Sequence, residues 1–299
     1  MFKKWMVGVL LLFCSISMVA AFDLSEADAL YDRDDFAQAK IALEAERSKA
    51  ANGKEEAEVL WRLARVMVGL GDDLDEEDKD GKFRLYEEGE AYALLSLEKA
   101  PSAMAYLWKS SNSGRWGQTK GPLNALGKAK GMLGDLTEVV NTFNTLDSTE
   151  TWYVLSSLYD ELPGGMISFG DKEWAISYMR MAMDTLTSKE LYPGHYKKLA
   201  EELYARNWSA SKRTKELKKM QADWQKASTN LERYRYYEGK DGGNTKPFYS
   251  SVPLTGMSDR QEAVMVLSYI LEKYKVFRPI KASDTEEIAE IEALRSKWV

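Results

Sequence analysis

The segment spanning residues 152–182 carries the feature that most restricts how this chain can fold. Large apolar and aromatic side chains recur in it at helical spacing, and small side chains stand among them; in order, these residues are Trp152, Leu155, Ser156, Tyr159, Ala175, Met179 and Ala182. Such spacing places each set on one face of a helix. Small side chains let two helices cross closely, which larger ones would prevent. The segment therefore predicts a hairpin of two tightly packed helices.

The same spacing matches the tetratricopeptide (TPR) motif, with Ser156 in place of the usual glycine. The second half of the motif recurs near the N-terminus, where the polar turn Asp34-Asp35 precedes Phe36 and Ala39. Apolar periodicity predicts further helices at residues 58–70, 85–100, 103–114 and 123–144. Hairpins of this kind bury their apolar faces by stacking on one another. We therefore predict an all-α, TPR-like array of helical hairpins, an α-solenoid.

Extra C-terminal helices are expected to follow this array. Residues 211–237 predict one long charged helix, which either caps the array or belongs to a second domain. The capping-box pairs Ser258–Gln261 and Ser283–Glu286 predict the starts of the last two helices. The predicted organisation is a leader at residues 1–21, helical repeats at 22–190 and a C-terminal helical or capping region at 191–299.

The first 21 residues have the features of an export signal. Lys3 and Lys4 precede an apolar run, and Val19-Ala20-Ala21 supplies the small residues that a signal peptidase recognises. We predict cleavage after Ala21 and a periplasmic protein without a membrane span. An uncleaved anchor is one alternative, although the apolar run is short for a membrane span. Lipidation of Cys14, the only cysteine, is another.

The composition excludes several classes of function. The net charge of −6 argues against binding to nucleic acid or anionic lipid. His195 is the only histidine, which argues against a Ser-His-Asp triad and an imidazole-based zinc site. No glycine-rich phosphate-binding motif follows a strand. We therefore predict a protein that is not an enzyme and binds no cofactor. A hydrolase that uses a pair of carboxylates is the alternative, since acidic residues are plentiful.

Residues 112–120 contain the polar and aromatic side chains that best suit a binding site. Arg115 can hold a carboxylate or phosphate through two hydrogen bonds. Trp116 can stack on a ring or a sugar, and Asn112 and Lys120 supply further polar groups nearby. The structural alternative is a turn between repeats, with Arg115 paired to an acid and Trp116 in the core.

The loop within the 152–182 hairpin is longer than the motif requires. It runs from residue 162 to residue 171. Because long loops in compact arrays are often functional, Pro163, Phe169 and Asp171 are candidates for the mouth of a ligand site. The alternative is that the loop only lets two helices separate around a bulky neighbour.

An acidic segment has the spacing of a calcium-binding loop. Glu76, Asp78, Asp80 and Glu87 fall at positions 1, 3, 5 and 12 of an EF-hand-like sequence. Glutamate at position 1 departs from the usual aspartate. The alternative is a solvated acidic turn at a helix N-terminus, where carboxylates are favourable.

Three stretches resemble a known family. They are Val59-Leu60-Trp61-Arg62-Leu63-Ala64-Arg65, residues 85–101, and residues 155–182 with their Leu-Pro-Gly loop. Over residues 25–190 the chain resembles TPR proteins of the regulator of microtubule dynamics type and their exported bacterial relatives. More loosely, it is similar to the periplasmic T-component of TRAP-type transporters. The resemblance implies a helical scaffold or a substrate-handling protein without catalytic activity.

The leading functional prediction is a periplasmic scaffold that binds an envelope protein or peptide. Stacked hairpins curve, and the concave face makes an extended groove for such a partner. The alternative is a small-molecule-binding accessory protein of a transporter, with a cleft near Arg115 and Trp116. A deep pocket would favour this alternative, and an open shallow groove would count against it.

Overall fold

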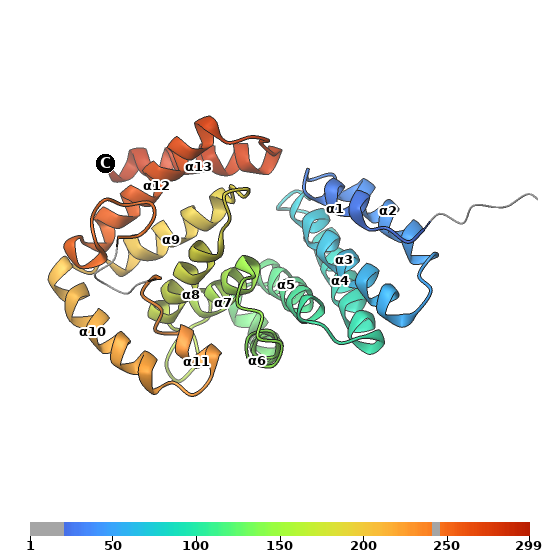
Figure 1. Cartoon of the computed structure of the whole chain (residues 1–299), viewed down its shortest axis with the longest axis horizontal. Helices are drawn as coiled ribbons and strands as arrows, with labels where there is room; N and C mark the ends of the chain where they lie inside the picture. Colours follow the sequence, from blue (N-terminus) through green and yellow to red (C-terminus); the bar gives the residue numbers. More distant parts are fainter. Residues whose placement is uncertain (1–20, 241–245) are drawn as a thin grey trace, which may run out of the picture.

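A computed structural model describes residues 21–240 and 246–299 (Figure 1). All regular secondary structure within these two ranges is helical, which confirms the all-α prediction. The helices of the first half are α1 (Ser25–Tyr31), α2 (Phe36–Arg47), α3 (Gly53–Asp72), α4 (Lys79–Lys99), α5 (Ala103–Lys120) and α6 (Pro122–Thr137), which continues into a π-helical turn (Glu138–Thr142). Those of the second half are α7 (Thr149–Glu161), α8 (Lys172–Thr185), α9 (Pro193–Arg206), α10 (Ala210–Lys226), α11 (Asn230–Tyr234), a 3-10 turn (Leu254–Gly256), α12 (Asp259–Val276) and α13 (Ala282–Trp298).

The helices follow one another around an arch (Figure 1). Helices α1 to α4 form one arm, α5 to α8 form the base, and α9, α12 and α13 form the other arm. Helix α10 lies on the outer side of this second arm, and α11 lies beside the base. The start of α13 lies beside the α1–α2 turn, where Ser283 Oγ donates to Asp34 Oδ2 at 2.7 Å. The two arms therefore meet, and the arch closes.

One cluster of buried apolar side chains extends from Trp61 to Ile291. It crosses the predicted domain boundary at residue 190 without interruption, because α8 and α12 both pack on α9. A second cluster joins α1 and α2 to α3. Within residues 21–240 and 246–299, no helix is both long enough and apolar enough to cross a bilayer. The predicted leader lies outside the described residues except for Ala21.

The α1–α2 hairpin forms as its sequence predicts. Helix α1 ends at Tyr31, and the Asp35 side chain accepts a hydrogen bond from the backbone N–H of Gln38 to start α2. Ala39 is completely buried. A Cβ atom on Gly69 of α3 would lie 2.7 Å from the Phe36 ring. The absence of that atom lets α2 approach α3 closely.

The α7–α8 hairpin also forms as predicted and explains why serine replaces the motif glycine. Trp152 is fully buried, its indole N–H donates to Leu146 O at 3.0 Å, and its ring stacks on Tyr178. Ser156 is equally buried, and its hydroxyl donates to Glu202 of α9 at 2.7 Å. Position 156 therefore links the hairpin to α9 through a hydrogen bond that glycine cannot make.

Several predicted helix boundaries are wrong. Helix α3 begins at Gly53, not near residue 58. Helix α4 begins at Lys79, not near residue 85, because the Asp78 side chain caps it by accepting from Gly81 N–H at 2.9 Å. Helix α5 continues past residue 114 to Lys120 and ends at Gly121, whose φ of 95° breaks the helix. The predicted helix 211–237 is divided, since α10 stops at Lys226 and Thr229 caps α11.

The N-terminal cap of α13 differs from the predicted one. The Ser258–Gln261 capping box is confirmed at α12. The Ser283–Glu286 box is not formed, because α13 begins at Ala282 and the Lys281 N–H donates to the Asp284 carboxylate at 3.1 Å. The Ser283 hydroxyl is thereby free of capping and bonds instead to Asp34 in the opposite arm.

A buried ionic network joins the helices of the second arm. The Arg180 guanidinium of α8 holds both carboxylate oxygens of Glu262 in α12, at 2.6 and 2.8 Å. Arg213 of α10 bonds to Glu262 at 2.8 Å and also pairs with Asp259, which Arg206 of α9 binds through two nitrogens. Burial alone would raise the pKa of Glu262, but the Arg180 and Arg213 charges lower it to about 2. These four helices are therefore fixed by charge pairs as well as by apolar packing.

Candidate functional site: the central cavity

A cavity of about 810 Å³ lies where the two arms face each other. Its walls come from the α1–α2 turn, the end of α3, the inner faces of α5 and α7, the α8–α9 connection and the segment from Phe277 to Glu287. This volume is typical of ligand sites in proteins. We call this space the central cavity.

Three stacked rings form one wall of the central cavity. The His195 ring lies 4.6 Å from the ring of Tyr153 and 5.1 Å from that of Tyr192, with interplanar angles of 25° and 30°. Tyr153 comes from α7, and His195 lies in the first turn of α9. All three residues line the cavity. The stack presents an aromatic surface that suits a flat group or an alkyl chain.

Tyr192 holds this position at a conformational cost. Its φ of 45° is left-handed, a region that a residue with a bulky side chain rarely adopts. The Tyr192 hydroxyl lies 3.4 Å from Glu150 Oε1, and Tyr192 is the N-cap residue of α9. Strain of this kind persists where the surrounding structure fixes a side chain, and it is concentrated at functional sites. Tyr192 therefore marks this wall as a candidate site.

Polar groups without partners line the cavity as well. Trp108 of α5 is 7% exposed, and its indole N–H has no hydrogen-bond partner. His195 is 8% exposed, and its Nε2 also lacks one. Buried polar atoms in proteins are usually hydrogen-bonded, so each exception calls for an explanation such as a ligand.

The cavity lining is strongly acidic. Nine carboxylates line it against four cationic side chains. The carboxylates are Asp32, Asp34, Asp72, Asp73, Glu150, Glu161, Glu190, Asp284 and Glu287. The cations are Arg65, Arg115, Lys189 and Lys281. The lining therefore favours a positively charged occupant over an anionic one.

Tyr31 shows that carboxylates from distant parts of the chain converge here. Burial raises the pKa of its hydroxyl. The charge of Arg65, whose guanidinium lies 3.9 Å from the Tyr31 ring centre, opposes this rise. The charges of Glu150, Asp72 and Asp34 add to it. These three acids come from α7, α3 and the α1–α2 turn, so the fold focuses negative charge on one region.

Two polar contacts join the arms of the arch at Asp34. Besides the hydrogen bond from Ser283, the Lys281 ammonium lies 3.5 Å from Asp34 Oδ1. Both partners of this ion pair are partly exposed, at 30% and 16%. Exposed pairs contribute about 0–1 kcal/mol to stability. This ion pair therefore contributes little to holding the two arms together.

The structure separates the residues predicted at 112–120. Asn112 is buried between helices, and its amide donates to Ala64 O and Trp108 O. Arg115 lines the central cavity and pairs with Asp72 at 2.8 Å. Trp116 lies outside the cavity lining and donates to Glu87, and the Lys120 ammonium lies 5.9 Å from its ring. Because α5 is a continuous helix here, only Arg115 of this group faces the cavity.

The predicted loop residues serve the geometry of the hairpin. Pro163 O accepts from Gly170 N–H at 3.2 Å, and Phe169 packs edge-on against Tyr159. The Asp171 carboxylate accepts from the N–H groups of Glu173 and Trp174, which caps α8. None of the three is among the residues that line the central cavity.

The acidic segment does not form the predicted open loop. Asp78 caps α4, Asp80 lies in its first turn, and Glu87 accepts from the Trp116 indole N–H. Helix α4 thus replaces most of the loop that would surround a calcium ion, and Glu76 precedes it in the α3–α4 turn. Across the described ranges, no group of three or more histidine, cysteine, aspartate or glutamate side chains is placed to hold a metal ion.

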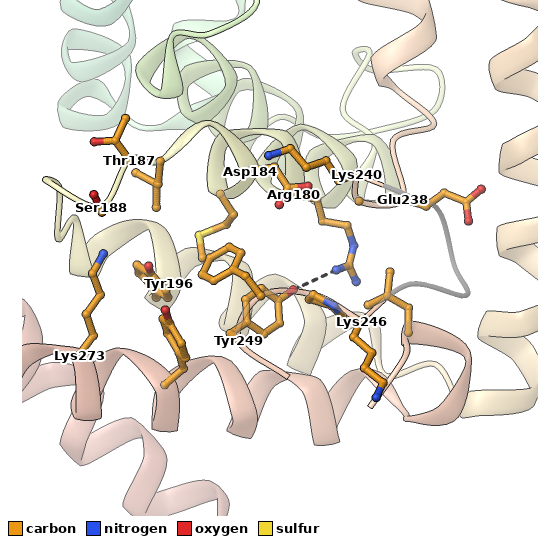
Figure 2. A pocket seen from close by; sticks show the side chains of 17 residues that line it. Arg180, Asp184, Thr187, Ser188, Tyr196, Glu238, Lys240, Lys246, Tyr249 and Lys273 are labelled. Atoms are coloured by element: carbon orange, nitrogen blue, oxygen red, sulfur yellow. Dashed lines mark hydrogen bonds between the residues drawn. The ribbon is translucent and has the colours of Figure 1, made fainter. Parts of the chain in front are cut away.

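A second pocket of about 480 Å³ lies between α8, α9 and α12. Figure 2 shows Lys240, Lys246 and Lys273 around it, and the hydrogen bond from Arg180 to the Tyr249 hydroxyl at 3.2 Å. Its basic side chains contrast with the acidic central cavity. Lys240 and Lys246 flank residues 241–245, which the structure does not describe, so the pocket wall is defined only in part. The central cavity is therefore the candidate site.

Sequence reasoning missed most of the cavity residues. The sequence relates His195 only to catalysis or zinc binding, and it does not single out Tyr153, Tyr192, Trp108 or Asp73. Tyr153 and Trp108 stand next to motif positions, on the helix face that a TPR array turns to its concave side. Their positions in the helical register could therefore have predicted that they line the cavity. No local sequence pattern predicts the left-handed backbone conformation of Tyr192.

His195 gives this site a measurable pH dependence. Burial lowers its pKa to about 3, and the charge of Lys198 adds to the effect. An unfolded histidine titrates near pH 6.5, so between these values only the unfolded chain binds the proton. We expect the free energy of unfolding to fall as the pH drops from about 6.5, at up to about 1.4 kcal/mol per unit.

The measurement is urea unfolding between about pH 7 and pH 5, on the native protein and on His195→Phe. Phenylalanine retains the ring stack, and no other histidine is present. The pH dependence in this window is expected to be much smaller in the variant. Parallel curves for the two proteins would show that the pKa of His195 is the same in the folded and the unfolded chain.

Comparison with known proteins matches residues 23–132 to the family model "Regulator of microtubule dynamics protein 1-3". No curated protein and no solved structure matches this chain. The resemblance to this family is thereby supported for the first part of the chain. The matched residues contain the α1–α2 turn, α3 and α5, which supply one side of the central cavity, whereas the aromatic wall lies outside them.

Proposed function

We propose that this protein is a non-enzymatic helical-repeat scaffold that binds a segment of a partner polypeptide in the central cavity. The observation that carries the proposal is the cavity itself, with its stacked rings, unpartnered polar groups and acidic lining. An extended segment would enter between the arms at Asp34, where the ion pair contributes little to holding them together. Helical-repeat arrays commonly bind extended partners along their inner surface. We propose a periplasmic location for this activity, which the leader predicted from residues 1–21 supports.

A small organic molecule is the second candidate occupant. The cavity volume of about 810 Å³ falls in the range that drug-sized ligands fill, and its walls combine aromatic and charged groups as such sites do. This role would suit an accessory protein of a transporter.

Site-specific photocross-linking in cells tests the proposal. A photoreactive amino acid replaces Ser157, a partly exposed residue of the cavity lining. The matched control replaces Leu95, an exposed residue of α4 outside the lining. Discrete protein adducts at position 157 and none at 95 are the expected result. Equal labelling at both positions would contradict binding in the cavity. A small molecule that co-purifies with the protein, without protein adducts, would favour the second candidate.

A further inference from the structure

Asp73 is one of several carboxylates of the central cavity that form no salt bridge among the described residues. Of the cavity's four cationic side chains, three already pair with carboxylates: Arg65 with Asp28, Arg115 with Asp72 and Lys281 with Asp34. Among the described residues, no basic side chain pairs with Asp73. Asp73 lies at the end of α3, on the cavity wall.

Asp73 is surrounded by charges of its own sign. Burial raises the pKa of its carboxyl group, and the charges of Asp34, Asp72 and Glu286 raise it further. Like charges held together without a cation repel one another, and a bound cation relieves that repulsion. Arg115 and Lys281 offset the charges of Asp72 and Asp34, whereas the exposed carboxylate of Asp73 has no such partner among the described residues. A positive group that enters the cavity would interact favourably with it.

The rest of the lining fits a basic side chain better than a bare ion. No set of three or more ligating groups in the described ranges is arranged around a metal. The stacked rings of Tyr153, His195 and Tyr192 offer an apolar surface for the alkyl stem of lysine or arginine. The unpartnered indole N–H of Trp108, in a side chain that is 7% exposed, is a donor for a carbonyl oxygen. A polypeptide supplies all three features together.

We propose that the central cavity selects its polypeptide segment by a lysine or arginine side chain held beside Asp73. This inference rests on the proposed function and specifies the chemistry of the partner. The charged end of that side chain lies among the carboxylates of Asp73, Asp34 and Asp72, and its stem lies along the aromatic wall. A glutamate or aspartate at the same place would meet the carboxylate of Asp73, which no basic side chain among the described residues neutralises, and is disfavoured.

Selection from a random dodecapeptide display library on the purified protein tests this inference. The matched variants are Asp73→Asn, which removes the charge at the site, and Asp75→Asn, an exposed residue outside the lining. Enrichment of lysine or arginine is the expected result. Peptides so selected should bind at least about tenfold more weakly to Asp73→Asn and equally well to Asp75→Asn. Their affinity should also fall as salt is raised.

Three other results would overturn the inference, and they differ in whether the proposed function still holds. Peptides without basic residues, or peptides that bind Asp73→Asn as well as the native protein, overturn it. If Tyr153→Ala abolishes their binding, the proposed function still holds. No enrichment at all overturns both proposals. In that case, binding of the probe n-butylguanidinium to the native protein and not to Asp73→Asn would assign the cavity to small organic cations. Circular dichroism checks that each variant is folded.

Discussion

Replacement of Glu262 by alanine is expected to lower the free energy of unfolding by about 3–5 kcal/mol. The carboxylate is completely buried and neutralises two guanidinium groups, those of Arg180 and Arg213. Arg213 is also fully buried. Removing the anion leaves two cations inside the second arm with less than their full charge compensation, and it deprives the Tyr249 hydroxyl of its acceptor. The loss therefore exceeds that of one ordinary hydrogen bond.

Urea unfolding of the native protein, Glu262→Ala and Glu272→Ala measures this effect. Glu272 lies on the same helix, is exposed and pairs only with Lys275 one turn away. Its replacement is expected to change stability by less than about 0.5 kcal/mol. If Glu262→Ala behaved like Glu272→Ala, the network would not contribute to holding α8, α10 and α12 together.

Replacement of Trp152 by alanine is expected to cost a similar amount, about 3–5 kcal/mol. The indole is fully buried between the rings of Tyr178 and Tyr234, at centroid distances of 5.9 and 4.7 Å. Its loss leaves a large cavity where α7, α8 and α11 meet, and it breaks the hydrogen bond to Leu146 O. Tyr153, which lines the central cavity, follows Trp152 directly in α7. We therefore also expect the Trp152→Ala variant to bind more weakly in the central cavity.

Trp116→Ala is the matched comparison for this prediction. Trp116 is partly exposed on α5 and contacts Phe83 at one side, so its removal leaves no enclosed void. Thermal unfolding of both variants should show a clearly larger decrease in midpoint for Trp152→Ala. Equal decreases would mean that the motif tryptophan has no special place in the core.

The elements that the sequence predicts correctly depend on neighbours a few residues away. The turn after Tyr31, the cap at Asp35 and the capping box at Ser258 each act through bonds within one helical turn. The small buried residue Ala39 follows from the 3.6-residue period of a helix that crosses another closely. Such signals lie in a short stretch of chain and can be read without the rest of the molecule.

The wrong boundaries come from local signals that tertiary packing overrides. Gly114 and Gly117 indicate a turn by propensity. The helix continues through them because Asn112 is fixed between α3 and α5 and only Gly121 leaves the helical conformation. The opposite error occurs at residues 227–229. The charged helix formers before and after them predict continuity, but the chain turns there and places Leu231 and Tyr234 against α8 and Trp152.

The amino-acid sequence by itself determined that this protein is an array of helical hairpins, because helix periodicity, caps and close-packing residues are written locally. Only the tertiary structure decided where the site lies. Asp34 and Ser283 are 249 residues apart, and they meet because small rotations between successive hairpins accumulate around the arch. The same accumulation brings Asp73, Tyr153 and His195 to one cavity. These accumulated rotations cannot be read from any short stretch of sequence, so the site forms only when the whole arch is folded.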